Sequence, residues 1–145
     1  MIEDFKILDG DPDQPIELFL NSLGGDIFSS LGIIDAMGLL KSPVHTIIQG
    51  NACSCAGIIS VCGKKRYITK NSYWMGHEIS VSAADYLSKI KDDYHLNLSL
   101  WDMILKIYKD RTMLIDADYD KITHGELWLN SEKCLEKGIV DEILK

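Results

Sequence analysis

A run of small residues, Gly50-Asn51-Ala52-Cys53-Ser54-Cys55-Ala56-Gly57, joins an apolar strand expected at 44–49 to an apolar helical stretch at 56–62. Such an abrupt strand-to-helix turn lifts the turn residue out of the sheet, and small neighbours let a substrate carbonyl approach it. The one hydroxyl in the run makes Ser54 a candidate nucleophile. The alternative is a tight packing point between helix and strand, where small side chains allow close backbone approach.

Two other segments carry elements of acyl-transfer chemistry. The glycine pair Gly24-Gly25 follows a strand expected at 16–20, although it could be only a strand-to-helix turn that needs positive φ. His77 ends an aromatic-rich strand and is a candidate general base, although it could instead be a partly buried histidine hydrogen-bonded to backbone. Because the three features occur in order at strand ends, we interpret them as one candidate site.

Length and charge limit the class of protein. With 145 residues, we expect a single domain, 1–145, whose site a partner chain could complete. Its 46% hydrophobic and 26% charged residues are typical of an ordinary globular protein. The net charge of −7 argues against a nucleic-acid surface. The basic cluster Lys64-Lys65-Arg66 is too short to reverse this, and we expect it to be a hairpin turn between two strands.

No segment approaches the roughly 18 consecutive apolar residues of a membrane span, and the start of the chain lacks the features of a signal peptide. We therefore expect a cytoplasmic protein without a membrane partner. The four cysteines fall mostly in buried-looking sequence, so we expect no disulfides. Cys53-Ser54-Cys55 is too tight for a zinc site. We expect no metal and no cofactor.

The first half of the chain alternates short apolar, β-branched runs with a stretch of helical spacing and a small-residue stretch. This alternation predicts an α/β fold with a parallel sheet and right-handed crossover connections. The expected strands are 16–20, 44–49, 66–69 and 72–75, and the expected helices are 27–40 and 56–62.

A long amphipathic helix is expected at about 83–111, where apolar residues recur at three- and four-residue steps. At 1.5 Å per residue its length would be on the order of 40 Å, more than the diameter of a domain of this size. Part of it should therefore project and bury its apolar stripe against another subunit. The alternative is a helix broken in two near Asn97-Leu98-Ser99.

The end of the chain is expected to hold two short helices. The acidic segment 116–123 predicts the first. The second would be capped by Asn130 or Ser131, whose side chains can accept hydrogen bonds from the free amides of the first turn. Gly138 should end this helix in a left-handed conformation, and 139–144 should close the chain as a strand or extended tail.

Four motifs stand in order along the chain: Asn21-Ser22-x-Gly24-Gly25, Gly50-x-Ala52-x-Ser54, Met75-Gly76-His77, and Ser131-Glu132 followed after five residues by Gly138-Ile139-Val140-Asp141. With them, the chain resembles the proteolytic subunit of Clp protease, a serine peptidase, from about residue 16 to the end. The resemblance implies a crotonase-like α/β fold of repeated β-β-α turns. It also implies homo-oligomeric heptameric rings, stacked in pairs as a tetradecamer through a long "handle" helix.

The resemblance also implies roles for individual residues. Ser54 matches the family's nucleophile and His77 matches its base. Gly25 and Cys55 match the backbone donors of the oxyanion hole, which stabilises the tetrahedral intermediate. Alignment back from the closing motif places Glu126 where the family usually has the aspartate of the triad. If Glu126 is not the acid, the alternatives are Asp110, Asp116, Asp118 and Asp120, or a dyad without an acid.

Four differences from the family pattern bear on function. Leu23 replaces the usual proline, and Cys53 and Cys55 replace a small residue and a methionine beside the serine. The segment 78–82 is shorter than the family's glycine-rich strand that pairs with substrate and helps to join the two rings. The chain starts near the end of what would be the family's first helix, so the elements that dock an AAA+ unfoldase partner are expected to be reduced.

We therefore predict a serine endopeptidase of the Clp type that hydrolyses unfolded or short polypeptides through an acyl-enzyme intermediate. The alternative is a catalytically weak or inactive ring or scaffold subunit with the same fold. A third reading, an acyl-CoA enzyme of the wider crotonase fold, would use the oxyanion glycine but gives no reason for a serine-histidine pair.

Overall fold

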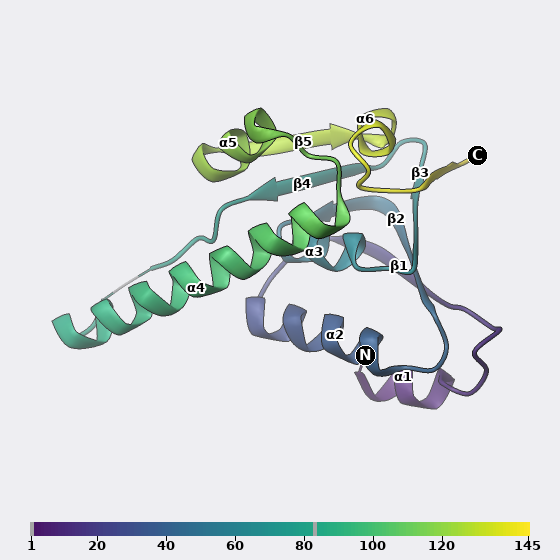
Figure 1. Cartoon of the computed structure of the whole chain (residues 1–145), viewed down its shortest axis with the longest axis horizontal. Helices are drawn as coiled ribbons and strands as arrows, with labels where there is room; N and C mark the ends of the chain where they lie inside the picture. The colour runs from purple at the N-terminus through teal and green to yellow at the C-terminus, as the bar shows by residue number, and fades with distance from the viewer. Residues whose placement is uncertain (1, 83) are drawn as a thin grey trace.

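The computed structural model describes residues 2–82 and 84–145 as a curled six-stranded sheet with helices packed on it (Figure 1). The fold is the α/β class expected. In chain order the elements are α1 Ile2–Leu8, β1 Ile16–Ser22, α2 Ile27–Leu39, β2 Val44–Cys53, α3 Cys55–Val61, β3 Lys65–Thr69, β4 Tyr73–His77, α4 Leu87–Arg111, α5 Asp116–His124, β5 Glu126–Asn130, α6 Ser131–Glu136 and β6 Glu142–Leu144.

Strand β2 is the centre of the sheet. It pairs in parallel with β1 along one edge and, on the other edge, first with β3 and then with β4. Strand β6 pairs in parallel with β3, whereas β5 pairs antiparallel with β4. The parallel pairing predicted for the first half of the chain is confirmed, and the antiparallel β5 was not foreseen.

Two sequence predictions about this sheet are wrong. The strand expected to stop at 49 continues to Cys53, because residues 51–53 pair with β4. The Lys64-Lys65-Arg66 cluster is not a hairpin turn: β3 starts at Lys65, is entered from α3 and runs parallel to β2. A parallel pair requires a crossover, which α3 provides.

Much of the core lies between the sheet and helices α3 and α4, and α5 and α6 add the fully buried Ile122 and Cys134. All seven residues of α3 are buried, which explains why its sequence is so small and apolar. Fully buried side chains from the sheet complete this core, with Trp74 packed edge-on against Tyr108 of α4 at a centroid distance of 5.7 Å. The sheet residues without solvent exposure are Ile48, Ala52, Cys53, Ile68 and Trp74.

Helix α4 is continuous over 25 residues, so the alternative of a break near 97–99 is wrong. It starts at Leu87 rather than 83, and residue 83 itself lies outside the described residues. Its buried residues all lie in the second half, from Leu100 to Tyr108. The first half projects from the body of the protein, as predicted (Figure 1). Exposed apolar side chains there include Leu87, Tyr94, Leu96 and Leu98.

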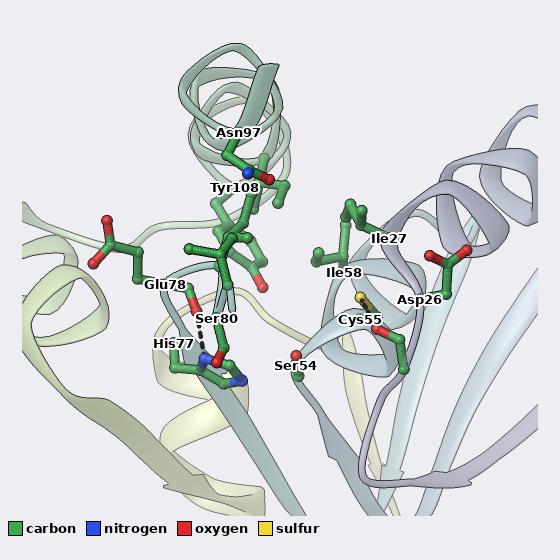
Figure 2. A pocket seen from close by; sticks show the side chains of 14 residues that line it. Asp26, Ile27, Ser54, Cys55, Ile58, His77, Glu78, Ser80, Asn97 and Tyr108 are labelled. Atoms are coloured by element: carbon green, nitrogen blue, oxygen red, sulfur yellow. Dashed lines mark hydrogen bonds between the residues drawn. The ribbon is translucent and has the colours of Figure 1, made fainter. Parts of the chain in front are cut away.

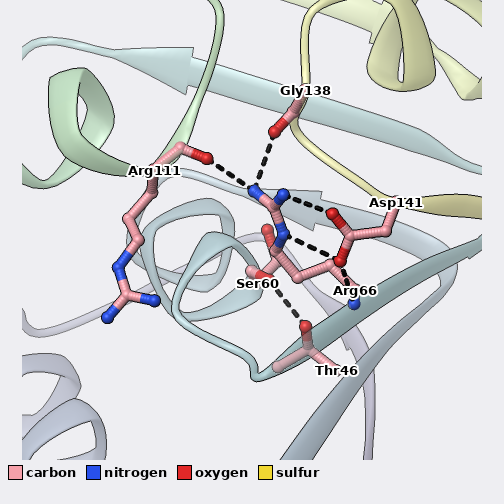
Figure 3. A network of polar contacts seen from close by, with 6 residues as sticks. All are labelled: Thr46, Ser60, Arg66, Arg111, Gly138 and Asp141. Carbon is pink, nitrogen blue, oxygen red and sulfur yellow. Dashed lines mark hydrogen bonds and ion pairs between the residues drawn. The ribbon is translucent and has the colours of Figure 1, made fainter.

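A network of polar contacts centred on Arg66 holds the C-terminal part of the chain against β3 (Figure 3). The Arg66 guanidinium pairs with the Asp141 carboxylate and donates to the carbonyls of Arg111, at 2.6 Å, and Gly138, at 2.7 Å. Gly138 has a φ of +64°, so the left-handed turn predicted there is confirmed. The network ties the end of α4 and the last turn of the chain to β3.

Asn130 caps α6 by accepting a hydrogen bond from the amide of Lys133 at 2.9 Å, which confirms one of the two predicted caps. All four cysteines carry free thiols. Within residues 2–82 and 84–145, none of the helices is both long and apolar enough to cross a membrane.

Candidate active site

Ser54 sits on the sharp turn between β2 and α3. Its φ of 54° and ψ of −124° make it the one non-glycine residue with positive φ among those described. Such a conformation costs on the order of 1–3 kcal/mol and persists only where the surroundings enforce it. Here the Ser54 amide donates to the Met75 carbonyl of β4 at 2.8 Å. The Ser54 hydroxyl has no hydrogen-bond partner in the described part of the chain and is directed into a pocket (Figure 2).

The glycine pair of the β1–α2 loop lies against this turn, and the two glycines serve different needs. A Cβ on Gly24, whose φ is +105°, would lie 2.7 Å from the Ser54 Cβ and 2.9 Å from the Cys53 carbonyl oxygen. A Cβ on Gly25 would meet nothing within 4 Å. Gly24 is therefore required for packing, whereas Gly25 borders open space.

Cys55 connects the two loops on this side of the site. Its thiol donates to the Gly25 carbonyl at 3.1 Å, across 30 residues of sequence. Its amide is the first of α3 and has no acceptor within that helix. The structure thus brings together Ser54, Gly25 and Cys55, three of the residues that the resemblance implies for the site.

His77 ends β4 on the opposite side of the pocket and is half-buried. Its Nδ1 hydrogen-bonds to the carbonyl oxygen of Glu78, and its other ring nitrogen is directed toward Ser54 (Figure 2). When Nδ1 carries the proton and donates to a carbonyl, Nε2 is left as an acceptor, the form that a general base needs. The backbone contact named as an alternative for His77 therefore coexists with the role of a base.

Glu126 is the residue paired with His77 in the antiparallel register of β4 and β5. Its carboxylate, however, is exposed and accepts a hydrogen bond from the Trp128 indole at 2.8 Å. The strands therefore bring Glu126 beside His77 in backbone register while its carboxylate is engaged elsewhere.

Two of the four other candidate acids have partners of their own. Asp118 accepts from the Ile115 amide and pairs with Lys137 at 2.7 Å, and Asp120 contacts His124. None of Asp110, Asp116, Asp118 and Asp120 lines the pocket at Ser54.

A pocket of about 270 Å³ opens beside Ser54 between α3, α4 and the segment that follows β4. Residues 78–82 of that segment form neither strand nor helix. The sequence did not identify several residues of this pocket, because they appeared only as members of apolar helical stripes: Ile27, Ile58, Ile104 and Tyr108.

Burial and hydrogen bonds fix the charge states around the pocket. Burial raises the pKa of Tyr108 far above its usual value, so this hydroxyl stays protonated. Hydrogen bonds from the Ser29 side chain and amide lower the pKa of Asp26, which caps α2 at the pocket rim. Burial, with a smaller contribution from Glu126, raises the pKa of the Cys53 thiol.

Comparison with known proteins identifies this architecture. The family model of Clp protease matches residues 1–145, the whole chain. The chain belongs to the Clp protease family. Among curated relatives, an ATP-dependent Clp protease proteolytic subunit of Deinococcus radiodurans is 27% identical over 135 residues, covering 92% of this chain and 66% of the relative. One of the same description from Bacteroides thetaiotaomicron is 30% identical over 139 residues, covering 92% and 62%.

The family resemblance drawn from the four motifs is therefore confirmed, and so is the fold that it implied. The curled sheet and the long α4 are consistent with the Clp protease fold. The chain spans a little under two thirds of the length of the curated Clp protease relatives that it matches.

Proposed function

We propose that this chain is a serine endopeptidase of the Clp type, a single peptidase domain that hydrolyses unfolded or short polypeptides. The observation that carries the proposal is the strained turn at Ser54, which faces a free ring nitrogen of His77 across a pocket. A positive φ at a non-glycine residue is costly, and such strain is concentrated at functional sites. A packing point between helix and strand would not need it.

In the proposed reaction, the Ser54 oxygen attacks the carbonyl carbon of a peptide bond while His77 Nε2 takes the hydroxyl proton. The amides of Gly25 and Cys55 donate hydrogen bonds to the oxyanion of the tetrahedral intermediate. His77 then gives the proton to the departing amine, which leaves an acyl-enzyme. Water, activated by the same histidine, releases the second product and restores Ser54.

We assign Glu126 as the acid that orients His77, because the register of the two strands makes it the neighbour of the histidine. In this role its carboxylate has to leave Trp128 and reach Nδ1, replacing the Glu78 carbonyl. A carboxylate at Nδ1 stabilises the imidazolium that forms during the reaction better than a carbonyl does.

We further propose that the chain acts as a homo-oligomer, heptameric or tetradecameric, with the exposed apolar stripe of α4 at the contact between subunits. The description of both relatives as ATP-dependent suggests an AAA+ unfoldase as a partner. A cytoplasmic location, no cofactor, and no nucleic-acid or membrane partner stay predictions. Mass photometry tests the assembly, and a stable monomer would contradict it.

A second candidate, a catalytically weak or inactive scaffold subunit, has two observations in its favour. The Glu126 carboxylate is held by Trp128, and the Ser54 hydroxyl has no partner within residues 2–82 and 84–145. A subunit that only builds a ring would tolerate this arrangement permanently.

Hydrolysis of a short fluorogenic peptide separates the two candidates. The wild-type protein should cleave the peptide, and Ser54→Ala should reduce turnover by at least roughly 10³-fold while leaving assembly intact. Ser99→Ala is the matched control, since Ser99 is exposed on α4 and bonds only to the His95 carbonyl of its own helix. Undiminished turnover in Ser54→Ala would contradict the proposal, and no turnover in the wild type would favour the scaffold.

A further inference from the structure

Tyr108 has an unusual position at the inner end of the pocket. It comes from α4, its side chain is only 1% exposed, and its ring packs edge-on against Trp74. It nevertheless lines the pocket that contains Ser54 and Cys55. Figure 2 shows the hydroxyl end of the ring directed into that pocket.

The Tyr108 hydroxyl has no hydrogen-bond partner in the part of the chain that the structure describes. In that same part, every fully buried side-chain nitrogen or oxygen has a partner. Because the Tyr108 hydroxyl has no partner, its oxygen is not one of these fully buried atoms. The hydroxyl must therefore be the part of this side chain that reaches the pocket surface, while the ring is enclosed. A buried tyrosine normally finds a partner for its hydroxyl, so this one is available to a ligand.

The rest of the pocket defines which ligand group fits. Ile27, Ile58 and Ile104 give it apolar walls, which suit an unbranched carbon stem. Its described lining contains no lysine or arginine to pair with an anionic group. Asp26 lies at the rim and the Glu78 carboxylate is directed away from the cavity (Figure 2), so a cationic group finds no counter-charge inside either. A side chain with an apolar stem and a neutral hydrogen-bond acceptor at its end fits the apolar walls, the lack of a counter-charge and the Tyr108 hydroxyl.

We propose that Tyr108 is a specificity-determining residue, whose hydroxyl donates a hydrogen bond to the terminal amide oxygen of a glutamine side chain in the substrate. This side chain belongs to the residue immediately before the scissile bond, because the pocket adjoins the nucleophile. The inference rests on the proposed peptidase function. A site that hydrogen-bonds a substrate group discriminates against the analogue that lacks it, because its own polar group is then left unpaired.

Two peptides that differ only at this residue test the proposal. One carries glutamine and the other homoleucine, which has the same shape without the amide. The wild-type protein should prefer glutamine in kcat/KM, and Tyr108→Phe should lower the glutamine-to-homoleucine ratio by roughly ten-fold. Tyr94→Phe is the matched control, because Tyr94 is 60% exposed on the same helix and does not line this pocket. It should leave the ratio unchanged.

The same ratio measured as binding, by calorimetry in a Ser54→Ala background, does not depend on turnover. Absence of hydrolysis with a preserved, Tyr108-dependent preference in Kd would reject the peptidase and keep the specificity assignment. An unchanged ratio in Tyr108→Phe, or an equal loss for both peptides, would overturn the assignment. An equal loss would mean that the hydroxyl only supports the packing of α4.

Discussion

The two sides of the site are held in place by different means. On one side, Ser54, Gly25 and Cys55 are fixed by backbone conformation, by the hydrogen bond from the Cys55 thiol to the Gly25 carbonyl, and by the close approach of Gly24. On the other, the His77 and Glu126 side chains are half-buried or exposed, and each has a partner other than its expected catalytic one.

This difference indicates which site groups the fold of one subunit positions by itself and which depend on a change of side-chain conformation. The proposed nucleophile and oxyanion donors depend on main-chain geometry that a folded monomer already has. The proposed acid and base depend on side-chain rotamers, which can change within nanoseconds when substrate or a neighbouring subunit binds. We therefore expect substitutions on the first side, apart from that of Ser54 itself, to act through structure and those on the second to act through proton transfer.

The largest effect expected on the histidine side is that of Glu126→Gln. If the carboxylate orients His77 during turnover, kcat should fall on the order of 10³-fold, because the imidazolium loses its counter-charge. Folding should be unaffected, since Glu126 is exposed. A near-normal kcat in steady-state assays would show that the Glu78 carbonyl suffices and that the site works as a dyad.

On the nucleophile side, Gly24→Ala should be the most damaging change to a residue without a catalytic group. The new Cβ would lie 2.7 Å from the Ser54 Cβ, so the turn has to move. A displacement of about 1 Å should slow labelling of Ser54 by a fluorophosphonate roughly 100-fold.

The matched control is Gly38→Ala in α2, where a Cβ meets nothing within 4 Å. This substitution should leave labelling unchanged and stabilise the helix by about 0.5–1 kcal/mol. Equal labelling rates in Gly24→Ala and Gly38→Ala would mean that the close approach of Gly24 does not hold the Ser54 turn in place.

A smaller effect of opposite sign is expected from Trp128→Phe. Removing the indole N–H frees the Glu126 carboxylate while keeping an aromatic ring on the strand. If a hydrogen bond worth roughly 1 kcal/mol holds the acid away from His77, kcat should rise about five-fold. The rise should vanish in the double variant with Glu126→Gln, and a lower kcat in Trp128→Phe alone would refute this view of the indole.

The smallest effect concerns the Arg66 network that ties the end of α4 and the last turn of the chain to β3. Burial alone would raise the pKa of Asp141, but its hydrogen bonds and ion pair with Arg66 outweigh this, and the pKa lies below 3.8. A lowered folded-state pKa adds stability that is present above pH 3.8 and is lost as pH falls through the folded value.

Asp141→Asn should therefore cost about 1 kcal/mol of unfolding free energy at pH 7, with the difference from wild type shrinking below pH 3.8. Denaturant titrations at pH 7 and at a pH below 3.8 measure this difference, with Asp102→Asn, at an exposed position, as a neutral control. A deficit that is the same at both pH values would exclude the ion pair as its cause.

How far the sequence predicted this molecule depends on how local each feature is. The turn at Ser54, the cap at Asn130 and the left-handed Gly138 follow from neighbouring residue types, so the sequence identified them. The length of β2 depends on its pairing with β4, a contact between distant segments, and the strand was therefore placed too short. Lys65 and Arg66 were assigned to a hairpin for the same reason.

The residues of the site show the same difference between local features and contacts that depend on the folded structure. The sequence named Ser54 and His77, but it gave no sign that Trp128 would hold Glu126 or that the Glu78 carbonyl would hold His77. These contacts depend on rotamers at the ends of two paired strands. Tyr108 looked like any apolar member of a helical stripe, and only the lack of a hydroxyl partner within residues 2–82 and 84–145 distinguishes it.

The most direct test of the central claim is the rate at which a fluorophosphonate labels Ser54, measured by mass spectrometry in the wild type and in His77→Ala. Rapid labelling confined to Ser54, slowed at least roughly 100-fold without the imidazole, is the predicted result. Modification of other serines, or a rate at Ser54 that does not depend on His77, would show that the two side chains on opposite walls of the pocket do not act together.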